Sequence, residues 1–291
     1  MKFDNKIEGV NITTATSTDD ILNNIKITGG LKIREIHEMD DWRDHMPIAI
    51  VGGGPSLADN LDKLRKYKYI MACGSVYDYL VKNNITPNWC VLCDPDPLII
   101  NYIQKAQSDT KFLVASQCDE KVFEYLNDAS HLIFKPRVYI WHAFGSNIDY
   151  NIFGKDKVLI GGGCTVGTRA MVIAMGMGYN TQHLFGMDTC LSNDYKHHSY
   201  EFNDPIKETI GNVFEIKLGG EDSPVFKVAG YMLGQFFDFK HLLSLHSDQL
   251  NVTVIGGGLL DYMLNYGKIQ AKNLTEEEKI KILDCKEQVN C

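Results

Sequence analysis

Two carboxylates flank a proline in Asp94-Pro95-Asp96, directly after the apolar run Trp89–Cys93. Mg²⁺ prefers oxygen ligands, and one or two carboxylates together with substrate phosphates are enough to hold it. The pair therefore predicts a Mg²⁺ site beside a bound nucleotide, with Asp94 as a catalytic candidate as well. The alternative is a prolyl turn whose acids cap the next helix.

A third acid and two histidines follow in the second half of the chain. Asp188 ends the apolar run 182–188, where it could contact a ribose, a metal or an acceptor hydroxyl, or could simply cap a turn. His197 and His198 are candidate catalytic residues, because an imidazole titrates near neutral pH and can act as a general acid or base. The alternative for this adjacent pair is a solvated loop.

A glycine turn at residues 47–57, PIAIVGGGPSL, joins a short apolar strand to a helical pattern over 57–66. Glycines let the backbone approach a ligand closely, and proline fits the first helical turn. Backbone N–H groups and the helix dipole make such a turn an anion site. The predicted phosphate-binding residues are Gly52, Gly53, Gly54, Pro55 and Ser56. The turn is neither G-x-G-x-x-G nor a P-loop, so a ligand-free tight turn is the alternative.

Two further strand ends supply nucleotide-binding candidates. Gly74 and Ser75 follow the predicted strand 69–74. A second glycine turn, with Gly163 as its last glycine, follows the predicted strand 158–160, and Thr165 is a plausible N-cap for the apolar helix that begins at Val166.

The elements that must position these residues alternate between strand and helix. Strands are predicted at 69–74, 89–93, 111–116 and 131–134, and helices at 76–84, 98–107 and 120–127. This alternation predicts an α/β class with a Rossmann-like, mostly parallel sheet and helices on both faces. Sites in such sheets lie beyond the carboxyl ends of the strands, so we expect Gly52, Gly74, Asp94 and Ser116 to converge.

The chain divides into three predicted parts. Residues 1–45 form an N-terminal arm with one helix at Thr18–Ile27, capped by Ser17 or Asp19; residues 46–265 form the Rossmann-like transferase domain; residues 266–291 form a helical tail. Within the domain, 135–157 has no clean period and is interpreted as a lid or an ordinary connection. A hairpin over 213–228, a helix over 229–247 and a strand over 251–258 complete it.

Composition excludes several functional classes. The net charge of −8 argues against a general nucleic-acid or membrane-surface binder. The first ten residues contain no apolar signal segment, and no run of about 18 apolar residues occurs, so we expect a cytoplasmic protein without membrane insertion. The eight cysteines are scattered, and Cys90 and Cys93 are interpreted as buried strand residues, not as zinc or redox ligands.

Three sequence blocks, taken in order, resemble the 6-hydroxymethylpterin diphosphokinase-like domain family. They are GGGPSL, ACGSVYDYLVKNNITPNWCVLCDPD, and GGGCTVGTRAMVIAMGMGYNTQHLFGMD with a following His, over roughly residues 47–200. Bacterial motility accessory factors share this domain, which is also similar to bacterial sialyltransferases that use CMP-sugars. The resemblance assigns the phosphate-binding turn to 53–57, the metal-linked acid to Asp94, the second ligand-side helix to Thr165 and Val166, and the "G-x-D" acid to Asp188.

Two positions depart from that family pattern. Asn88 stands where the family has the Asp of "P-D", and Gly74-Ser75 replaces the acid often found after the second strand. Both changes bear on the substrate that the resemblance implies.

The expected function is therefore a nucleotide-dependent transferase. The resemblance implies Mg²⁺-assisted transfer of diphosphate from ATP to a small hydroxylated acceptor, a reaction that depends mainly on positioning and charge neutralisation. The alternative is a glycosyltransferase that uses a CMP-activated sialic or other nonulosonic acid without a metal. A third possibility is a nucleotide-binding module without catalysis. The expected partners are a nucleotide and a small acceptor, with a homo-oligomer left open.

Overall fold

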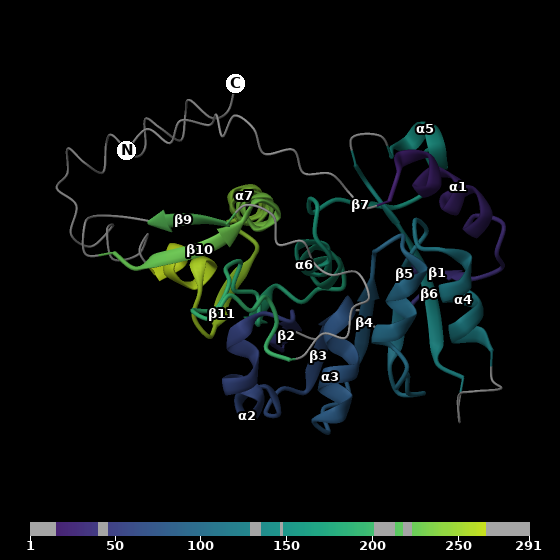
Figure 1. Ribbon diagram of the computed structural model, residues 1–291. Coiled ribbons are helices and arrows are strands. Elements are labelled where there is room, and N and C mark those ends of the chain that lie inside the picture. The colour runs from purple at the N-terminus through teal and green to yellow at the C-terminus, as the bar shows by residue number, and fades with distance from the viewer. Residues whose placement is uncertain are drawn as a thin grey trace.

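One parallel sheet organises the fold (Figure 1). The computed structural model describes residues 16–39, 46–128, 135–145, 148–200, 213–217 and 223–265. Within these residues a nine-stranded sheet has the order β1-β6-β5-β4-β3-β2-β8-β11, with β7 paired to β6. All of its strand pairs are parallel. The predicted Rossmann-like α/β class is confirmed.

The central strands are short and almost wholly buried. They are β2 (Ile48–Val51), β3 (Tyr69–Cys73), β4 (Trp89–Leu92) and β5 (Lys111–Ala115). All four side chains of β2 are buried. Strands covered on both faces read as continuous apolar runs, because neither side meets water. This is why the sequence located these four strands so well.

The strand order reverses at β2. Following the chain from β2, strands β3, β4, β5 and β6 (Arg137–Ala143) are added on one side, whereas β8 (Thr181–Phe185) and β11 (Asn251–Ile255) lie on the other. The carboxyl ends of strands at such a reversal leave a crevice, where ligands bind in open α/β sheets. The turns after β2 and β8 therefore meet at the place where a site is expected.

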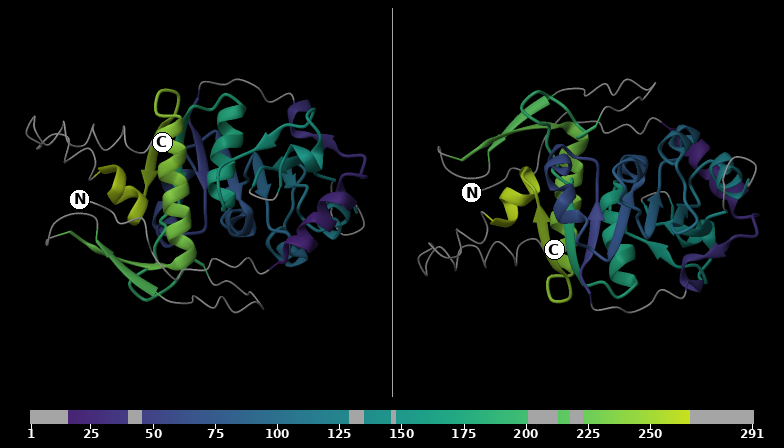
Figure 2. Two further views of the ribbon diagram at one scale, coloured as in Figure 1. Left: turned by 90° about the horizontal axis from the view of Figure 1, so that it is seen from above. Right: turned by 90° about the horizontal axis from the view of Figure 1, so that it is seen from below.

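Helices cover both faces of the sheet (Figure 2). α2 (Leu61–Leu64) and α3 (Tyr77–Lys82) lie on one face, and α6 (Val166–Gly176) lies on the other, against β2, β3 and β4. α7 (Gly230–Leu245) contacts α6. The remaining helical segments of this core are η2 (Pro55–Asn60), η3 (Gly74–Val76), η4 (Pro97–Tyr102) and α4 (Glu120–Asn127).

Three predicted helices are shorter or tighter than expected. The helix predicted over 57–66 is split into η2 and α2, and that over 76–84 begins in η3 and continues as α3. The helix predicted over 98–107 is wrong beyond η4. Its continuation is prevented because the Asp78 carboxylate accepts hydrogen bonds from the backbone N–H groups of Gln104 and Lys105, at 3.2 and 3.0 Å.

The interpretation of residues 135–157 as an irregular lid or connection is wrong. Residues 137–143 form β6, between β1 and β5, and α5 (Tyr150–Phe153) and β7 (Leu159–Ile160) follow it. Trp141 is fully buried, and its indole N–H donates to the Leu113 carbonyl at 3.1 Å. Aromatic side chains favour strands, but the polar Arg137 and His142 interrupt the apolar run that the other strands show.

Other predicted elements are confirmed or lie outside the described residues. β9 (Val213–Lys217) and β10 (Val225–Ala229) pair antiparallel, as the hairpin prediction requires. The strand predicted over 131–134 and the tail predicted over 266–291 both fall outside what the structure describes. In the part of the chain that it does describe, no helix combines the length and apolarity needed to cross a membrane.

The N-terminal segment is bound to the carboxyl edge of the sheet. α1 (Thr18–Thr28) begins at the predicted N-cap Ser17, whose hydroxyl accepts from the Asp20 N–H, and β1 (Arg34–Glu35) extends the sheet beside β6 before η1 (Ile36–Glu38). The Asn24 side-chain amide donates to the carbonyls of Pro95 and Gln117. The buried Thr28 hydroxyl donates to the Ser116 carbonyl at 2.6 Å. α1 is thereby attached to the loops that follow β4 and β5.

Replacing Thr28 with Val tests this attachment. The change keeps the shape of the side chain but removes the donor, which leaves the Ser116 carbonyl without it. We expect the free energy of unfolding in urea to fall by about 1–3 kcal/mol, the usual cost of an unpaired buried polar group. Thr253→Val on the exposed face of β11 is the matched control. Equal stability of the two variants would show that the hydroxyl does not hold α1 in place.

Candidate functional site

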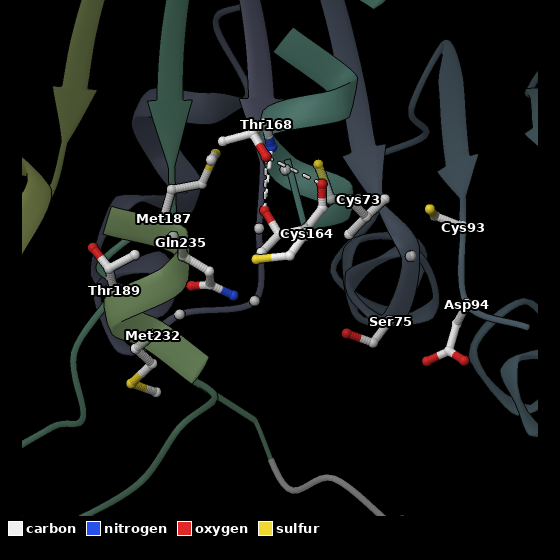
Figure 3. A pocket seen from close by; sticks show the side chains of 18 of the residues that line it. Cys73, Ser75, Cys93, Asp94, Cys164, Thr168, Met187, Thr189, Met232 and Gln235 are labelled. Carbon is white, nitrogen blue, oxygen red and sulfur yellow. Dashed lines mark hydrogen bonds between the residues drawn. The ribbon is translucent and has the colours of Figure 1, made fainter. Parts of the chain in front are cut away.

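A cavity of about 520 Å³ opens at the carboxyl ends of β2, β3, β4 and β8 (Figure 3). The predicted site residues that line it are Gly52, Gly53, Gly54, Gly74, Ser75, Asp94, Thr165, Asp188, His197 and His198. Those that do not line it are Pro55, Ser56, Asp96 and Gly163. The structure thus brings together most of the residues that the sequence singled out, from segments far apart in the chain.

The glycine turn after β2 is joined to the turn after β8 by backbone hydrogen bonds. The Gly52 N–H donates to the Phe185 carbonyl at 2.8 Å, and the Gly54 N–H donates to the Gly186 carbonyl at 2.7 Å. A Cβ atom on Gly54 would lie 2.7 Å from that same carbonyl oxygen. Glycine is required here by a close approach between two backbones. Two of the N–H groups predicted to hold a phosphate are already used inside the protein.

Asp188 lies beneath this turn and caps η2. One carboxylate oxygen accepts the Ser56 N–H at 2.9 Å, and the side chain is only 4% exposed. Burial raises the pKa of Asp188, and the hydrogen bonds from Ser56 oppose that rise. A negative group at the start of a helical segment satisfies its first N–H groups, as a bound phosphate would. Asp188 therefore occupies the anion position that the sequence assigned to a nucleotide.

The second glycine turn leaves the first N–H groups of α6 at the cavity. Thr165 is the N-cap, as predicted, and its hydroxyl accepts from the Thr168 N–H at 3.4 Å. Gly163, at φ +85°, carries the turn, and the neighbouring Cys164 N–H donates to Asp238 at 2.7 Å. Val166 and Gly167 both line the cavity, and N–H groups in the first turn of an α-helix have no intrahelical acceptor. α6 is eleven residues long, so its dipole favours an anion at this point.

The two acids of Asp94-Pro95-Asp96 have different surroundings. Asp94 faces the cavity on the same side as Ser75, opposite Met232 and Gln235 of α7 (Figure 3). Its carboxylate also accepts the Asp96 N–H at 3.0 Å. The Asp96 carboxylate caps η4 by accepting the Leu98 N–H at 2.9 Å, as the alternative interpretation expected.

The described residues do not provide a ready metal cluster. Among them, no group of three or more His, Cys, Asp or Glu side chains is arranged to hold an ion. A Mg²⁺ ion here would rely on Asp94 together with nucleotide phosphates and water. Asp96 caps η4 and does not line the cavity, and the metal roles of Asp94 and Asp96 stay predictions.

The two histidines form a stack across the glycine turn. The ring centroids of His197 and His198 are 4.1 Å apart, and His198 stacks on Tyr200 at 5.2 Å. Nδ1 of His198 and the Gly53 carbonyl are 3.3 Å apart, and the Ser199 N–H donates to the same carbonyl at 3.0 Å. The pair is half-buried instead of solvated, and it closes one side of the cavity.

His197 and His198 differ in what they contact. Nδ1 of His197 is hydrogen-bonded to the Tyr231 hydroxyl at 3.3 Å, at the start of α7. Tyr200 continues the stack of His198 onto Tyr79 of α3 at 4.6 Å. His198 thus contacts the glycine turn and the Tyr200 ring, whereas His197 is hydrogen-bonded to the hydroxyl of Tyr231, at the start of α7. His197 is the better candidate for proton transfer.

Sequence reasoning missed the contributions of α1 and α7. Ile21 of α1 and Met232, Gln235 and Phe239 of α7 line the cavity. Neither helix carries a motif, and only the folded chain shows that they reach the strand ends. Among the described residues that line the cavity there is no Lys or Arg, so histidine is the only side chain there that can carry positive charge.

The cysteine prediction holds for one residue of the pair. Cys90 is buried within β4, whereas Cys93 lies just beyond the strand and lines the cavity. Burial raises the pKa of Cys93 to about 11, so its thiol is protonated at neutral pH. That state suits neither a thiolate ligand nor a nucleophile.

Asn88, which departs from the family pattern, lies away from the cavity. Its side-chain carbonyl accepts the Ile70 N–H at 2.8 Å, and its own N–H donates to the Ile70 carbonyl at 2.9 Å. Both contacts join the amino ends of β3 and β4. The missing charge at this position therefore does not alter the lining of the site.

Comparison with known proteins identifies a domain family. The family model described as 6-hydroxymethylpterin diphosphokinase MptE-like matches residues 20–194. No curated protein matches the chain. Among solved structures, the MAf glycosyltransferase from Magnetospirillum magneticum AMB-1 aligns with a TM-score of 0.61 and 17% identity, covering 83% of this chain and 37% of that protein. This likeness shows a shared fold, and this chain spans little more than a third of that relative.

A more distant likeness is to a mammalian sialyltransferase. It aligns with a TM-score of 0.43 and 9% identity, over 84% of this chain and 81% of that protein.

Replacing Asp188 with Asn tests the burial of this acid. Because burial raises its pKa above 3.8, the native state binds more protons than the unfolded chain in the range upward from pH 3.8. The contribution of Asp188 to the free energy of unfolding therefore falls as pH rises through this range, whereas Asn, which does not ionise, makes no such pH-dependent contribution. We expect the stability difference to shift in favour of Asp188→Asn with rising pH, measured by urea unfolding. The exposed Asp248→Asn is the control. A difference that stays constant with pH would contradict the raised pKa.

Proposed function

Because the chain belongs to the 6-hydroxymethylpterin diphosphokinase MptE-like family, we propose that it is a transferase with a nucleotide-activated donor bound in the cavity at the strand ends. The observation that carries this proposal is the start of α6. Val166 and Gly167, in the first turn of this helix, line the cavity, whereas the Ser56 N–H of η2 donates to Asp188. A donor phosphate is best stabilised at the helix that still offers donors.

The charge of the cavity favours a donor with a single phosphate. A nucleoside triphosphate brings several negative charges, which proteins neutralise with Lys, Arg or Mg²⁺. The described lining contains no Lys or Arg, and it contains the carboxylates of Asp94 and Asp188. A nonulosonic acid activated as a nucleoside monophosphate ester carries one phosphate charge and one carboxylate charge, less than a triphosphate, and one helix N-terminus can stabilise the phosphate. Transfer of a glycosyl group from such a donor, of the CMP-nonulosonic acid type, is the function that this geometry supports best.

Glycosyl transfer from such a donor requires two things of the protein: transfer of one proton and stabilisation of the charge on the leaving phosphate. The bond between the anomeric carbon and the phosphate oxygen breaks, the acceptor hydroxyl bonds to that carbon, and its proton must leave. His197, positioned by the Tyr231 hydroxyl, could take that proton or protonate the departing phosphate. The N–H groups at the start of α6 stabilise the charge that develops on the phosphate as the bond breaks. The name of the MAf glycosyltransferase, whose fold this chain shares, adds support.

A second candidate is transfer of diphosphate from ATP to a small hydroxylated acceptor. The family description supports it, and Asp94 is the observation in its favour, because this carboxylate faces the cavity where a nucleotide-bound Mg²⁺ would lie. In that reaction the ion must supply the positive charge that the described side chains lack. The two candidates thus differ in their dependence on a divalent cation.

A charge placed at the start of α6 tests where the donor binds. Val166→Asp puts a carboxylate at the first position of the helix. The helix dipole stabilises a carboxylate there, but the carboxylate repels a bound phosphate. Val166→Asn has nearly the same shape without the charge. We expect thermal stabilisation by CMP to be lost in Val166→Asp and largely retained in Val166→Asn. Equal binding of CMP by both variants would place the phosphate elsewhere.

A product assay separates the candidate reactions. The parent protein, incubated with CMP-sugars or with ATP and Mg²⁺, is assayed for released CMP and for AMP, each with and without EDTA. We expect CMP release that persists in EDTA and falls about 10²–10⁴-fold in His197→Ala, as loss of a general acid or base predicts. His198→Ala is the neighbouring comparison and should cost less, because its contacts are structural. AMP formation that requires Mg²⁺ would favour the diphosphate reaction. Nucleotide binding without either product would favour a non-catalytic module.

A further inference from the structure

A second cavity lies between α1, β1, the end of β6 and α5. Figure 1 shows these elements together at the β1 side of the sheet. Its volume is about 590 Å³, within the range of small-molecule sites. None of the residues that line it lines the first cavity. Both reach α1, where Ile21 lines the first cavity and Leu22 and Ile25 line the second. This second cavity is therefore a distinct space.

His142 is the feature that points to a ligand. It comes from β6, lines the cavity and is 4% exposed, yet neither ring nitrogen has a hydrogen-bond partner among the described residues. The nearest charged group, the Glu35 carboxylate, is 3.7 Å from Nε2. Burial lowers the pKa of His142, although Glu35 opposes this, so the ring is neutral at pH 7 and offers one donor and one acceptor. A group buried in this way requires a partner.

The charged side chains around the cavity neutralise one another. Glu35 forms an ion pair with Lys157 and lies 3.4 Å from His37. Burial raises the pKa of Glu35, but the hydrogen bond and charge of Lys157 outweigh it and keep the pKa below its ordinary value. Glu38 pairs with Arg34. Lys26 of α1 also lines the cavity, so two acidic and two basic side chains belong to its lining, and their charges balance.

The remaining wall is apolar. Phe153 of α5 lies against the His142 ring, with centroids 4.5 Å apart. Ile25, Ile33 and Ile140 add aliphatic surface on the sides formed by α1, the segment before β1 and β6. A ligand that fits must present carbon-bound hydrogens to this wall and groups that both donate and accept hydrogen bonds to His142 and Glu35. Hydroxyl groups on a saturated ring meet both conditions.

We propose that this second cavity binds a neutral, hydroxyl-rich small molecule of the sugar class, with a hydroxyl at the His142 imidazole and the ring against Phe153. The carboxylate of Glu35 and the ammonium of Lys157 accept from and donate to neighbouring hydroxyls while remaining paired with each other. Ile152, 40% exposed at the rim, lies where the ligand enters. The site does not depend on the proposed function, because it shares no lining residue with the first cavity.

The test uses the full chain labelled with ¹⁵N-histidine. Glucose, galactose and N-acetylglucosamine are titrated to millimolar concentrations, with acetate and inorganic phosphate as charged comparators, while imidazole nitrogens are followed by NMR. The His142 resonances are assigned by their absence in His142→Gln. We expect at least one sugar to shift them with saturation, while the resonances of His197 and His198 stay in place.

Variants at the rim confirm where the sugar binds. Ile152→Trp fills the entrance and should abolish the shift, whereas Ile152→Ala leaves it open and should preserve the shift. Folding of Ile152→Trp is checked by circular dichroism. If it does not fold, Leu31→Trp, at a second partly exposed position of the lining, replaces it as the blocking variant. The proposal is overturned if none of the three sugars shifts His142, if acetate or phosphate shifts it more than every sugar, or if the shift survives in the folded blocking variant. The result of the CMP-binding experiment with Val166→Asp does not affect the His142 titrations, so either proposal can be disproved while the other stands.

Discussion

The hydrogen bond between the Asp188 carboxylate and the Ser56 N–H is the constraint on which the site depends. It holds the turn after β2 against the turn after β8, and the Gly54-to-Gly186 backbone bond lies beside it. With a side chain at Gly54 the two turns could not approach this closely, because a Cβ atom would lie 2.3 Å from the carboxylate. The glycine run is therefore explained by contact between two parts of the protein before any ligand is considered.

This arrangement gives the two glycine turns different tasks. The first is closed by an internal carboxylate, and the second begins a longer helix whose first-turn residues Val166 and Gly167 line the cavity. This helix start, with no Lys or Arg among the described lining residues, is the ground for proposing a donor with one phosphate instead of three. The charged groups that line the cavity, more than its shape, are thus the basis for the choice between a nucleoside triphosphate and a nucleoside monophosphate sugar as the proposed donor.

Much of the fold was predictable because the central strands are buried on both faces. β2 to β5 appear in the sequence as unbroken apolar runs, and Ser17 and Thr165 are ordinary N-caps with polar side chains at helix starts. β6 was missed because its sequence contains the polar residues Arg137 and His142 beside its apolar residues. The length of the helix over 98–107 was overestimated because Asp78, in α3, accepts a hydrogen bond from the backbone N–H of Gln104. Such effects come from residues distant in sequence. The site shows the same division: the strand-end residues and the capping alternative for Asp188 were identified, but the lining from α7 and the N–H of Ser56 as the partner of Asp188 required the folded chain.

The Asp188–Ser56 contact also has a consequence for the order of assembly during synthesis. The two residues are 132 positions apart, so the turn after β2 remains open until β8 has left the ribosome and inserted beside β2. Strands β2 to β5 add in sequence order and pair with neighbours as they emerge. Insertion of β8 is a non-local step, because a long loop must close before the contact forms. Until then the glycine turn lacks the contact with Asp188, and the cavity at the strand ends is incomplete.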